Sequence, residues 1–158
     1  TFGGGSVLMY LLDTNVVSEL RKVRSGNADV GVAEWSTKVD AAELYLSAVS
    51  ILEIELGVLL IERRDSRQGA LLRRWFEQQV LPEFEMRTLP IDAQVARRAA
   101  RLHVPDKRGE RDALIAASAL IHGMTVVTRN ITDFKPTGVS LLNPWSGNQV
   151  KGRNKPRP

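Results

Sequence analysis

Short apolar runs recur along the chain and predict buried β-strands. Each run is three or four residues long and is bounded by polar or turn-forming residues. Runs of this kind are typical of a parallel sheet, in which both faces are covered and polar residues do not alternate with apolar ones. The strands predicted in this way are residues 9–12, 44–47, 124–127 and 139–142, and residues 87–89 are a further candidate strand without an apolar run.

The intervals between these strands show the spacing of apolar residues that is typical of helices. The predicted helices are residues 16–20, 32–39, 50–61, 66–81, 92–103 and 112–122. Because strands and helices alternate, the chain is predicted to be an α/β protein with a central parallel β-sheet flanked by α-helices on both faces. Ligands bind such sheets beyond the carboxyl ends of the strands, so residues that directly follow a strand are candidate site residues.

Local signals predict how individual helices begin, end and pack. Ser50 and Glu53 match the Ser-x-x-Glu pattern of a capping box, which places a helix start at Ser50. Apolar residues lie on most faces of this helix, so we expect it to be largely buried. Pro82 is expected to end the helix that precedes it, and Gly123 suits the left-handed conformation at a helix C-terminus.

The composition is that of one globular domain, which we place at residues 9–145. Hydrophobic residues make up 43% of the 158-residue chain and charged residues 25%. The chain contains no cysteine, which excludes disulfide bonds and thiolate metal sites and fits a reducing compartment such as the cytoplasm. No apolar run reaches the roughly 18 residues of a membrane span, so we expect no membrane association.

The two ends differ from the body of the chain. Residues 1–8 are glycine-rich and lack the features of a secretion signal, so we expect a linker, with Met9 as the natural first residue. Residues 146–158 carry four basic residues and no acid, which leaves 18 basic and 18 acidic residues in the remainder. The net charge of +4 therefore belongs to this tail, which we expect to be disordered and either without a role or in contact with nucleic acid.

Four acidic residues lie next to apolar segments and are candidate metal ligands. Asp13 directly follows the first predicted strand, Asp133 lies shortly after the fourth, and Glu53 and Asp112 lie near helix starts. Two carboxylates about 5 Å apart repel by roughly 3 kcal/mol at an effective dielectric of 20, so a convergent group needs protons or a cation. Oxygen ligands favour Mg²⁺ or Mn²⁺, which suit phosphodiester hydrolysis.

Each acid taken alone also has a structural explanation. Asp13 and Asp112 could be ordinary N-caps, Glu53 the second half of a capping box, and Asp133 a turn residue. The two histidines, His103 and His122, end predicted helices, where an imidazole interacts favourably with the helix dipole, and we do not expect them to be catalytic.

The order of these motifs adds to the interpretation. The segments concerned are Leu11-Leu12-Asp13-Thr14-Asn15-Val16-Val17-Ser18-Glu19, Leu46-Ser47-Ala48-Val49-Ser50-Ile51-Leu52-Glu53-Ile54-Glu55-Leu56-Gly57, Asp112-Ala113-Leu114-Ile115-Ala116-Ala117-Ser118-Ala119, Val126-Val127-Thr128-Arg129-Asn130 with Asp133-Phe134, and Leu142-Asn143-Pro144-Trp145. Together they resemble the PIN-domain ribonucleases, most closely the VapC-like toxins of bacterial toxin–antitoxin pairs, including the FitB-type branch. The resemblance extends over roughly residues 9–145.

The resemblance implies a PIN-like fold and acids gathered around Mg²⁺ or Mn²⁺. It implies cleavage of single-stranded RNA, often tRNA or rRNA, and inhibition of translation. The implied partners are a cognate VapB-like antitoxin that blocks the site, promoter DNA bound only through the antitoxin, and a second copy of the toxin in a homodimer. The helices around residues 16–20 and 54–61 could expose apolar surface for such partners, although core packing explains them equally well.

The resemblance also suggests residue roles. Asp13, Glu53 and Asp112 occupy the positions of the first three family acids. The fourth position holds Asn130, where some relatives have an acid, so either Asn130 or Asp133 would complete the metal site.

The metal-bound water is the expected nucleophile, with Asp13 and Asp112 as the main ligands. Glu53 is expected to complete the ligand set or orient the water. Thr128 and Asn15 are expected to position a ligand or a water. Four basic residues could hold RNA phosphates or simply be solvated at the surface: Lys107, Arg108, Arg111 and Arg129.

Two other functions were weighed. A haloacid-dehalogenase-like phosphatase also places an Asp after its first strand, but it needs a second Asp two positions later, where this chain has Asn15. A PIN fold without catalysis, acting with an antitoxin as a transcriptional repressor, is the main alternative, and Asn130 is the residue that leaves it open.

Overall fold

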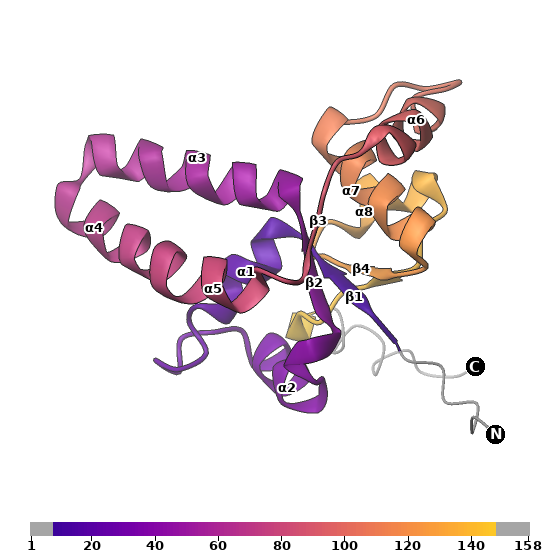
Figure 1. The fold of residues 1–158 in the computed structure, drawn as a ribbon. Helices are drawn as coiled ribbons and strands as arrows, with labels where there is room; N and C mark the ends of the chain where they lie inside the picture. The colour runs from indigo at the N-terminus through magenta and orange to yellow at the C-terminus, as the bar shows by residue number, and fades with distance from the viewer. Residues whose placement is uncertain (1–7, 148–158) are drawn as a thin grey trace, which may run out of the picture.

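A five-stranded parallel sheet forms the centre of the protein (Figure 1). The computed structural model describes residues 8–147, so residues 1–7 of the predicted linker and residues 148–158 of the predicted tail lie outside the described residues. Ser146, the first residue of the predicted disordered tail, is ordered, because its amide and hydroxyl donate to the Asp29 carboxylate. The strand order is β3-β2-β1-β4-β5, and every pair of neighbours is parallel. The strands are β1 Tyr10–Leu12, β2 Leu44–Ser47, β3 Thr88–Leu89, β4 Thr125–Val127 and β5 Leu141–Leu142. All five predicted strands are therefore confirmed, most of them with slightly shorter bounds.

Helices connect successive strands and cover the sheet, as the alternating pattern predicts. They are α1 Thr14–Leu20, α2 Val30–Lys38, α3 Ala48–Arg64, α4 Ser66–Trp75, α5 Leu81–Phe84, α6 Ala93–Leu102, α7 Glu110–His122 and α8 Ile131–Phe134. Three shorter turns are η1 Ala41–Glu43, η2 Phe76–Val80 and η3 Lys135–Thr137. Within residues 8–147, no helix is both long enough and apolar enough to cross a lipid bilayer.

The two faces of the sheet pack against different helices. Successive side chains of a strand point to opposite faces, so neighbouring residues of β1 enter different clusters. Leu12 packs with Val16 of α1 and with residues of α3 and α4, whereas Leu11 packs with Ile115 and Ala116 of α7. Figure 1 accordingly shows α1, α3 and α4 on one side of the strands and α6, α7 and α8 on the other. The predicted α/β architecture with two covered faces is confirmed.

The predicted capping box at the start of α3 is wrong. The helix begins directly after β2 at Ala48, and Ser47 is its N-cap, with its hydroxyl accepting from the amide of Val49 at 3.0 Å. Ser50 thus lies inside the helix, buried, and among residues 8–147 its hydroxyl has no hydrogen-bond partner. Ser47 is as good a cap as Ser50 and comes first along the chain, so it sets the boundary.

The expectation that α3 is largely buried is also wrong. Only one stripe of the helix, including Ile54 and Val58, enters the core. Leu52, Leu59 and Leu60 are each more than half exposed. The reason is that α3 and α4 form a long hairpin that extends away from the sheet (Figure 1), so within residues 8–147 no other element covers the outer faces of α3.

Pro82 does not end the preceding helix, contrary to expectation. The chain continues from α4 through the π-helical turn η2 into α5, which contains Pro82 in its first turn. At the end of η2 the amide of Leu81 donates to the carbonyl of Phe76, five residues earlier. This wider turn relieves the contact that a proline ring would make with the carbonyl four residues back.

The start of α7 differs from the N-cap interpretation of Asp112. Gly109 is the N-cap, and Asp112 lies within the first turn of the helix, so it does not cap the helix. The predicted end is confirmed, because Gly123 adopts the left-handed conformation with φ of 66°. The carboxylate of Asp112 is therefore available for interactions outside the helix.

Candidate functional site

The site lies where the two central strands end. β1 and β4 are neighbours in the sheet and end in register, with Leu12 beside Val127. Asp13 follows β1 and Thr128 follows β4, and both side chains are buried. The Thr128 hydroxyl donates to Oδ2 of Asp13 at 2.8 Å. The predicted placement of both residues at one edge of the sheet is confirmed.

Asp13 is held by three donors. Its Oδ1 accepts from the amide of Thr14 at 2.8 Å, which makes it the N-cap of α1. Its Oδ2 accepts from Thr128 and, at 3.4 Å, from the side-chain amide of Asn15. Asp13 is thus an N-cap, as the structural explanation predicted, but only its Oδ1 atom accepts the capping hydrogen bond. Asn15 contacts the carboxylate that it was predicted to orient.

The loop after β4 is bound to the start of α1. The amide of Arg129 donates to Oδ1 of Asn15 at 3.5 Å, and the amide of Asn130 donates to the Thr128 hydroxyl oxygen at 2.9 Å. Thr128 therefore accepts one hydrogen bond and donates another, which fixes the direction of its hydroxyl. This arrangement places the loop that carries Asn130 against the Asp13 carboxylate.

Glu53 enters the site from the second turn of α3 and is half-buried. Its Oε1 accepts from the Thr14 hydroxyl at 3.1 Å, and its Oε2 lies 3.9 Å from Nη1 of Arg111 on α7. Glu53 thus connects three helices, α1, α3 and α7. The bond to Thr14 was not predicted, because the two residues are 39 positions apart and no local pattern joins them.

Asp112 faces the same region from the first turn of α7. It is half-buried, and its Oδ2 would lie 3.4 Å from a Cβ atom added at Gly109. The backbone of the preceding loop therefore passes close to this carboxylate. A helix N-terminus also carries a partial positive charge that favours a negative side chain in its first turn.

The pKa values show that the four acids affect one another. The pKa of Asp112 is raised to about 6, mainly by burial and then by the charges of Asp13, Asp133 and Glu53 in that order. Burial also raises the pKa of Asp13, against the hydrogen bonds from Thr128 and Thr14, with a smaller contribution from Asp133. The structure therefore brings all four predicted acids into one electrostatic group.

The pKa of Glu53 is set by the same balance of effects. Burial raises it most, the hydrogen bond from Thr14 lowers it, the charge of Asp13 raises it, and Arg111 lowers it. Arg111 is therefore the one predicted phosphate-contact residue that interacts with the acids. It offsets only part of the negative charge, since it is mainly exposed and lies 3.9 Å from a single carboxylate.

The donor set fits a hard divalent cation. The four acids offer only oxygen ligands, and the raised pKa values of Asp13, Glu53 and Asp112 reflect burial and repulsion that a cation would relieve. Within residues 8–147, no three acidic, histidine or cysteine side chains are grouped closely enough to hold a metal ion between them. Mg²⁺ does not need three such ligands, because it usually keeps several waters and binds through one or two carboxylates.

The fourth ligand stays open between Asn130 and Asp133. Asn130 is the N-cap of α8 but its side chain makes no capping hydrogen bond, and Asp133 lies in the only turn of this short helix. Both side chains are exposed. Asp133 contributes to the pKa values of Asp13 and Asp112, which shows that its charge reaches the group.

The other predicted phosphate-contact residues lie around this group rather than within it. The Arg129 guanidinium lies over the ring of Trp145, 5.5 Å from its centroid. Lys107 is exposed, and the Nε atom of Arg108 is buried without a hydrogen-bond partner among the described residues. These contacts do not test a role in RNA binding, which stays a prediction.

Comparison with known proteins agrees with the motifs and the fold. The PIN domain family matches residues 10–137 of the chain. VapC ribonuclease Y4jK from Sinorhizobium fredii is 34% identical over 142 residues, covering 87% of this chain and 98% of that protein. Toxin FitB from Neisseria gonorrhoeae is 34% identical over 142 residues, covering 87% of this chain and 99% of its own. The crystal structure of FitAcB from Neisseria gonorrhoeae superposes with a TM-score of 0.78 at 34% identity, covering 87% of this chain and 99% of the other.

Proposed function

The chain belongs to the PIN-domain family, and we propose that it is a Mg²⁺- or Mn²⁺-dependent endoribonuclease, the toxin of a toxin–antitoxin pair. The observation that carries this proposal is the electrostatic group of Asp13, Glu53, Asp112 and Asp133 beyond the ends of the central strands. A relative of matching length and 34% identity is named a ribonuclease, which supports hydrolysis of RNA as the reaction.

Asp13 and Asp112 would hold the metal ion through their carboxylate oxygens, with Asp133 or Asn130 completing the site. When bound, the cation supplies charge for the scissile phosphate and acidifies a water for attack. Thr128 and Asn15 keep the Asp13 carboxylate in one orientation through their hydrogen bonds. This fixes the ligand before any metal arrives, which is the usual role of residues that contact ligands from behind.

Glu53 is suited to a different task in the proposed mechanism. The Thr14 hydroxyl holds one of its oxygens and Arg111 approaches the other. Its raised pKa makes it a better proton acceptor than an ordinary surface glutamate. We therefore assign to Glu53 the orientation of the attacking water and the acceptance of its proton.

The proposed substrate is single-stranded RNA, such as tRNA, rRNA or mRNA, and the proposed outcome is inhibition of translation in the cytoplasm. The site supports this choice because Arg111 lies beside the acids and Arg129 and Lys107 are exposed near their motifs. Basic side chains of this kind contact phosphates and position the chain, while carrying little base specificity.

A cognate VapB-like antitoxin is the proposed partner, with promoter DNA bound only through it, and the toxin itself is proposed to form a homodimer. The exposed leucines of α3 support the need for a partner, since four of them follow helical spacing at Leu52, Leu56, Leu59 and Leu60. An apolar stripe on an exposed helix is an unfavourable surface unless something covers it.

The test is cleavage of total bacterial RNA by purified protein, with cut ends mapped by sequencing. We expect discrete cuts with Mg²⁺ or Mn²⁺, none with chelator, and none with Asp13→Asn or Asp112→Asn. The matched control is Asp65→Asn, because Asp65 is an exposed N-cap outside the site and asparagine caps equally well. Lack of cutting by folded, metal-supplied protein would contradict the proposal.

A non-catalytic PIN fold that acts with an antitoxin as a transcriptional repressor is the second candidate. Asn130 favours it, because an uncharged residue stands where some relatives have an acid. Expression in a bacterial host separates the two functions. Catalytic toxicity predicts normal growth with Asp13→Asn, whereas a binding module predicts the same growth defect with and without this substitution.

A further inference from the structure

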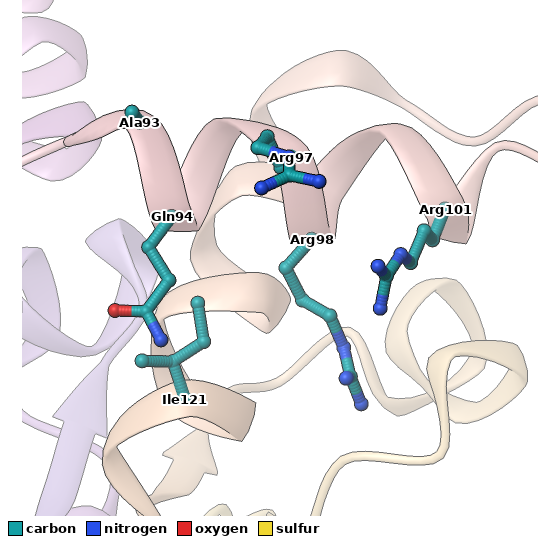
Figure 2. Close-up of a pocket in the computed structure, with 6 residues that line it drawn as sticks. All are labelled: Ala93, Gln94, Arg97, Arg98, Arg101 and Ile121. Atoms are coloured by element: carbon teal, nitrogen blue, oxygen red, sulfur yellow. The ribbon is translucent and has the colours of Figure 1, made fainter.

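One side of α6 carries a cavity with three arginines among its six lining residues. Its lining residues are Ala93, Gln94, Arg97, Arg98, Arg101 and Ile121, and its volume is about 340 Å³. Gln94, Arg97, Arg98 and Arg101 follow i, i+3, i+4, i+7 spacing, which places them on one face of the helix. Figure 2 shows Gln94, Arg98 and Arg101 leaving α6 on the side where Ile121 of α7 lies.

A neighbouring face of α6 holds the helix against α7, so the arginines are not needed for packing. Val95 and Ala99 are buried and pack with Ala113 and Ala117 of α7. The three arginines are exposed, and within the part of the chain that the structure describes they form no ion pair and no hydrogen bond with a carboxylate. Their positive charge is therefore uncompensated locally.

This local charge contrasts with the rest of the body. Without the tail the chain has equal numbers of basic and acidic residues, yet residues 93–111 hold six basic residues and only two acidic ones. The four-residue face from Gln94 to Arg101 extends about 10 Å along the helix. A face of this length and charge matches two or three consecutive phosphates of a nucleic acid strand.

The face is connected to the acidic site by the chain itself. α6 ends at Leu102, and the loop of residues 103–109 leads directly into α7, whose first turn carries Asp112. That loop contains Lys107 and Arg108, and Arg111 follows in α7 beside Glu53. Along the sequence, basic residues therefore continue from the α6 face to the start of α7. Asp106 and Glu110 are the two acidic residues in this interval.

We propose that the α6 face formed by Gln94, Arg97, Arg98 and Arg101 binds the phosphate backbone of the RNA substrate at a distance from the cut. This inference rests on the proposed ribonuclease function and extends it to a second contact region. Arginine suits the role because its guanidinium stays charged and offers paired donors to phosphate oxygens. The contact selects for RNA length and strand direction rather than for a base.

The experiment measures binding of a fluorescent single-stranded RNA across a salt series, in an Asp112→Asn background that prevents cleavage. The test variant is Arg97→Gln/Arg98→Gln/Arg101→Gln. The matched control is Arg63→Gln/Arg64→Gln/Arg67→Gln, which removes the same charge from exposed arginines at the far turn of the α3–α4 hairpin. A third variant, Arg97→Lys/Arg98→Lys/Arg101→Lys, keeps the charge, and thermal unfolding checks that all variants are folded.

We expect the α6 glutamine variant to bind RNA at least about tenfold more weakly at 0.15 M salt, and the slope of log Kd against log salt to fall by about 2. The control and the lysine variant are expected to stay within about threefold of the parent. With the original Asp112, cleavage of long RNA is expected to weaken more than cleavage of a short oligonucleotide that cannot reach α6.

Equal weakening by the α6 variant and the control would show general charge attraction and overturn the proposal. Unchanged binding by the α6 variant, of an RNA that the parent binds and the unaltered protein cuts, would overturn it while leaving the proposed ribonuclease function intact. If the parent protein neither binds nor cuts RNA, both the α6 proposal and the proposed ribonuclease function are overturned. A variant that loses binding to poly-glutamate as strongly as to RNA would point to an acidic protein partner instead.

Discussion

Thr128 donates its hydroxyl hydrogen to the Asp13 carboxylate at 2.8 Å, across 115 positions of sequence and between two buried side chains. The same hydroxyl oxygen accepts from the amide of Asn130 at 2.9 Å. One small side chain therefore fixes both the Asp13 carboxylate and the loop that carries Asn130. Removal of this hydroxyl should affect the two together.

Thr128→Val keeps the shape of the side chain but leaves the Asn130 amide without its acceptor and removes the shorter of the two hydrogen bonds to Oδ2 of Asp13. We expect the free energy of unfolding to fall by about 1–3 kcal/mol, the usual cost of a buried unsatisfied polar group. The pKa of Asp13 should rise further, because the Thr128 bond is the largest contribution that lowers it. Urea unfolding and NMR titration of the Asp13 carboxyl measure these effects. Thr128→Ser is the control, and equal results for valine and serine would contradict the assigned role.

The pH dependence of stability follows from Asp112. Its pKa is raised to about 6 in the folded protein, above the ordinary aspartate value of about 3.9. Between pH 4 and 6 the folded state therefore binds more protons than the unfolded state, and its stability decreases as pH rises through this window. We therefore expect the contribution of Asp112 to make the metal-free protein more stable near pH 5 than near pH 7.

Chemical denaturation from pH 4 to 8 in the presence of chelator measures this effect. Asp112→Asn should flatten the dependence, since the amide does not titrate, whereas Asp106→Asn on the exposed loop should leave it unchanged. A metal-free protein whose stability shows the same fall with pH after Asp112→Asn would place the titrating group elsewhere.

Metal binding should relieve the repulsion among the acids and so stabilise the folded protein. We expect Mg²⁺ or Mn²⁺ to raise Tm at neutral pH, and a concentration of 100 times Kd would stabilise the fold by about 2.7 kcal/mol. The gain should fall sharply in Asp13→Asn and Asp112→Asn and persist in Asp65→Asn. Differential scanning fluorimetry with a Mg²⁺ series and a chelator control measures it. A gain that is equal in all three variants would indicate binding outside the acidic group.

Much of this architecture can be predicted from the sequence because its signals are local. Four of the five strands lie in short, largely apolar runs, and Asp13 follows the first of them directly, so its place at the sheet edge can be inferred from topology. The partners of the acids cannot be found in this way. Thr14 and Glu53 are 39 residues apart, and only the packing of α1 against α3 brings them together.

Periodicity also shows which helix faces are apolar without showing what covers them. The residues of α3 predict a helix, but burial depends on the hairpin direction, and that depends on how α4 packs back on α3. Arg73 of α4 fixes this packing by contacts with Glu55 and Glu62 of α3 at 2.6 and 2.7 Å. Glu55, which points away from the acidic group, belongs to this contact.

The exposed leucines of α3 give the last prediction. Leu52→Gln, Leu56→Gln, Leu59→Gln and Leu60→Gln in one protein should change the free energy of unfolding by little more than a few tenths of a kcal/mol per site, because these side chains already contact solvent. Association should be lost, because the proposed homodimer or antitoxin contact needs an apolar surface on this helix. Sedimentation or light scattering of the purified toxin, and co-purification with an antitoxin encoded beside it, measure the two outcomes.

The matched control for the leucine variant is Val58→Ala, which removes buried methyl groups from the same helix while keeping its surface. It should lower the free energy of unfolding by about 1–3 kcal/mol and leave association intact, because the loss is internal to the core. The leucine variant should lose association and keep its stability, whereas Val58→Ala should lose stability and keep association. This contrast separates a binding face from a packing face. A leucine variant that unfolds as readily as Val58→Ala would mean that the stripe stabilises the chain itself, and one that still associates with every partner would place the interface on another element.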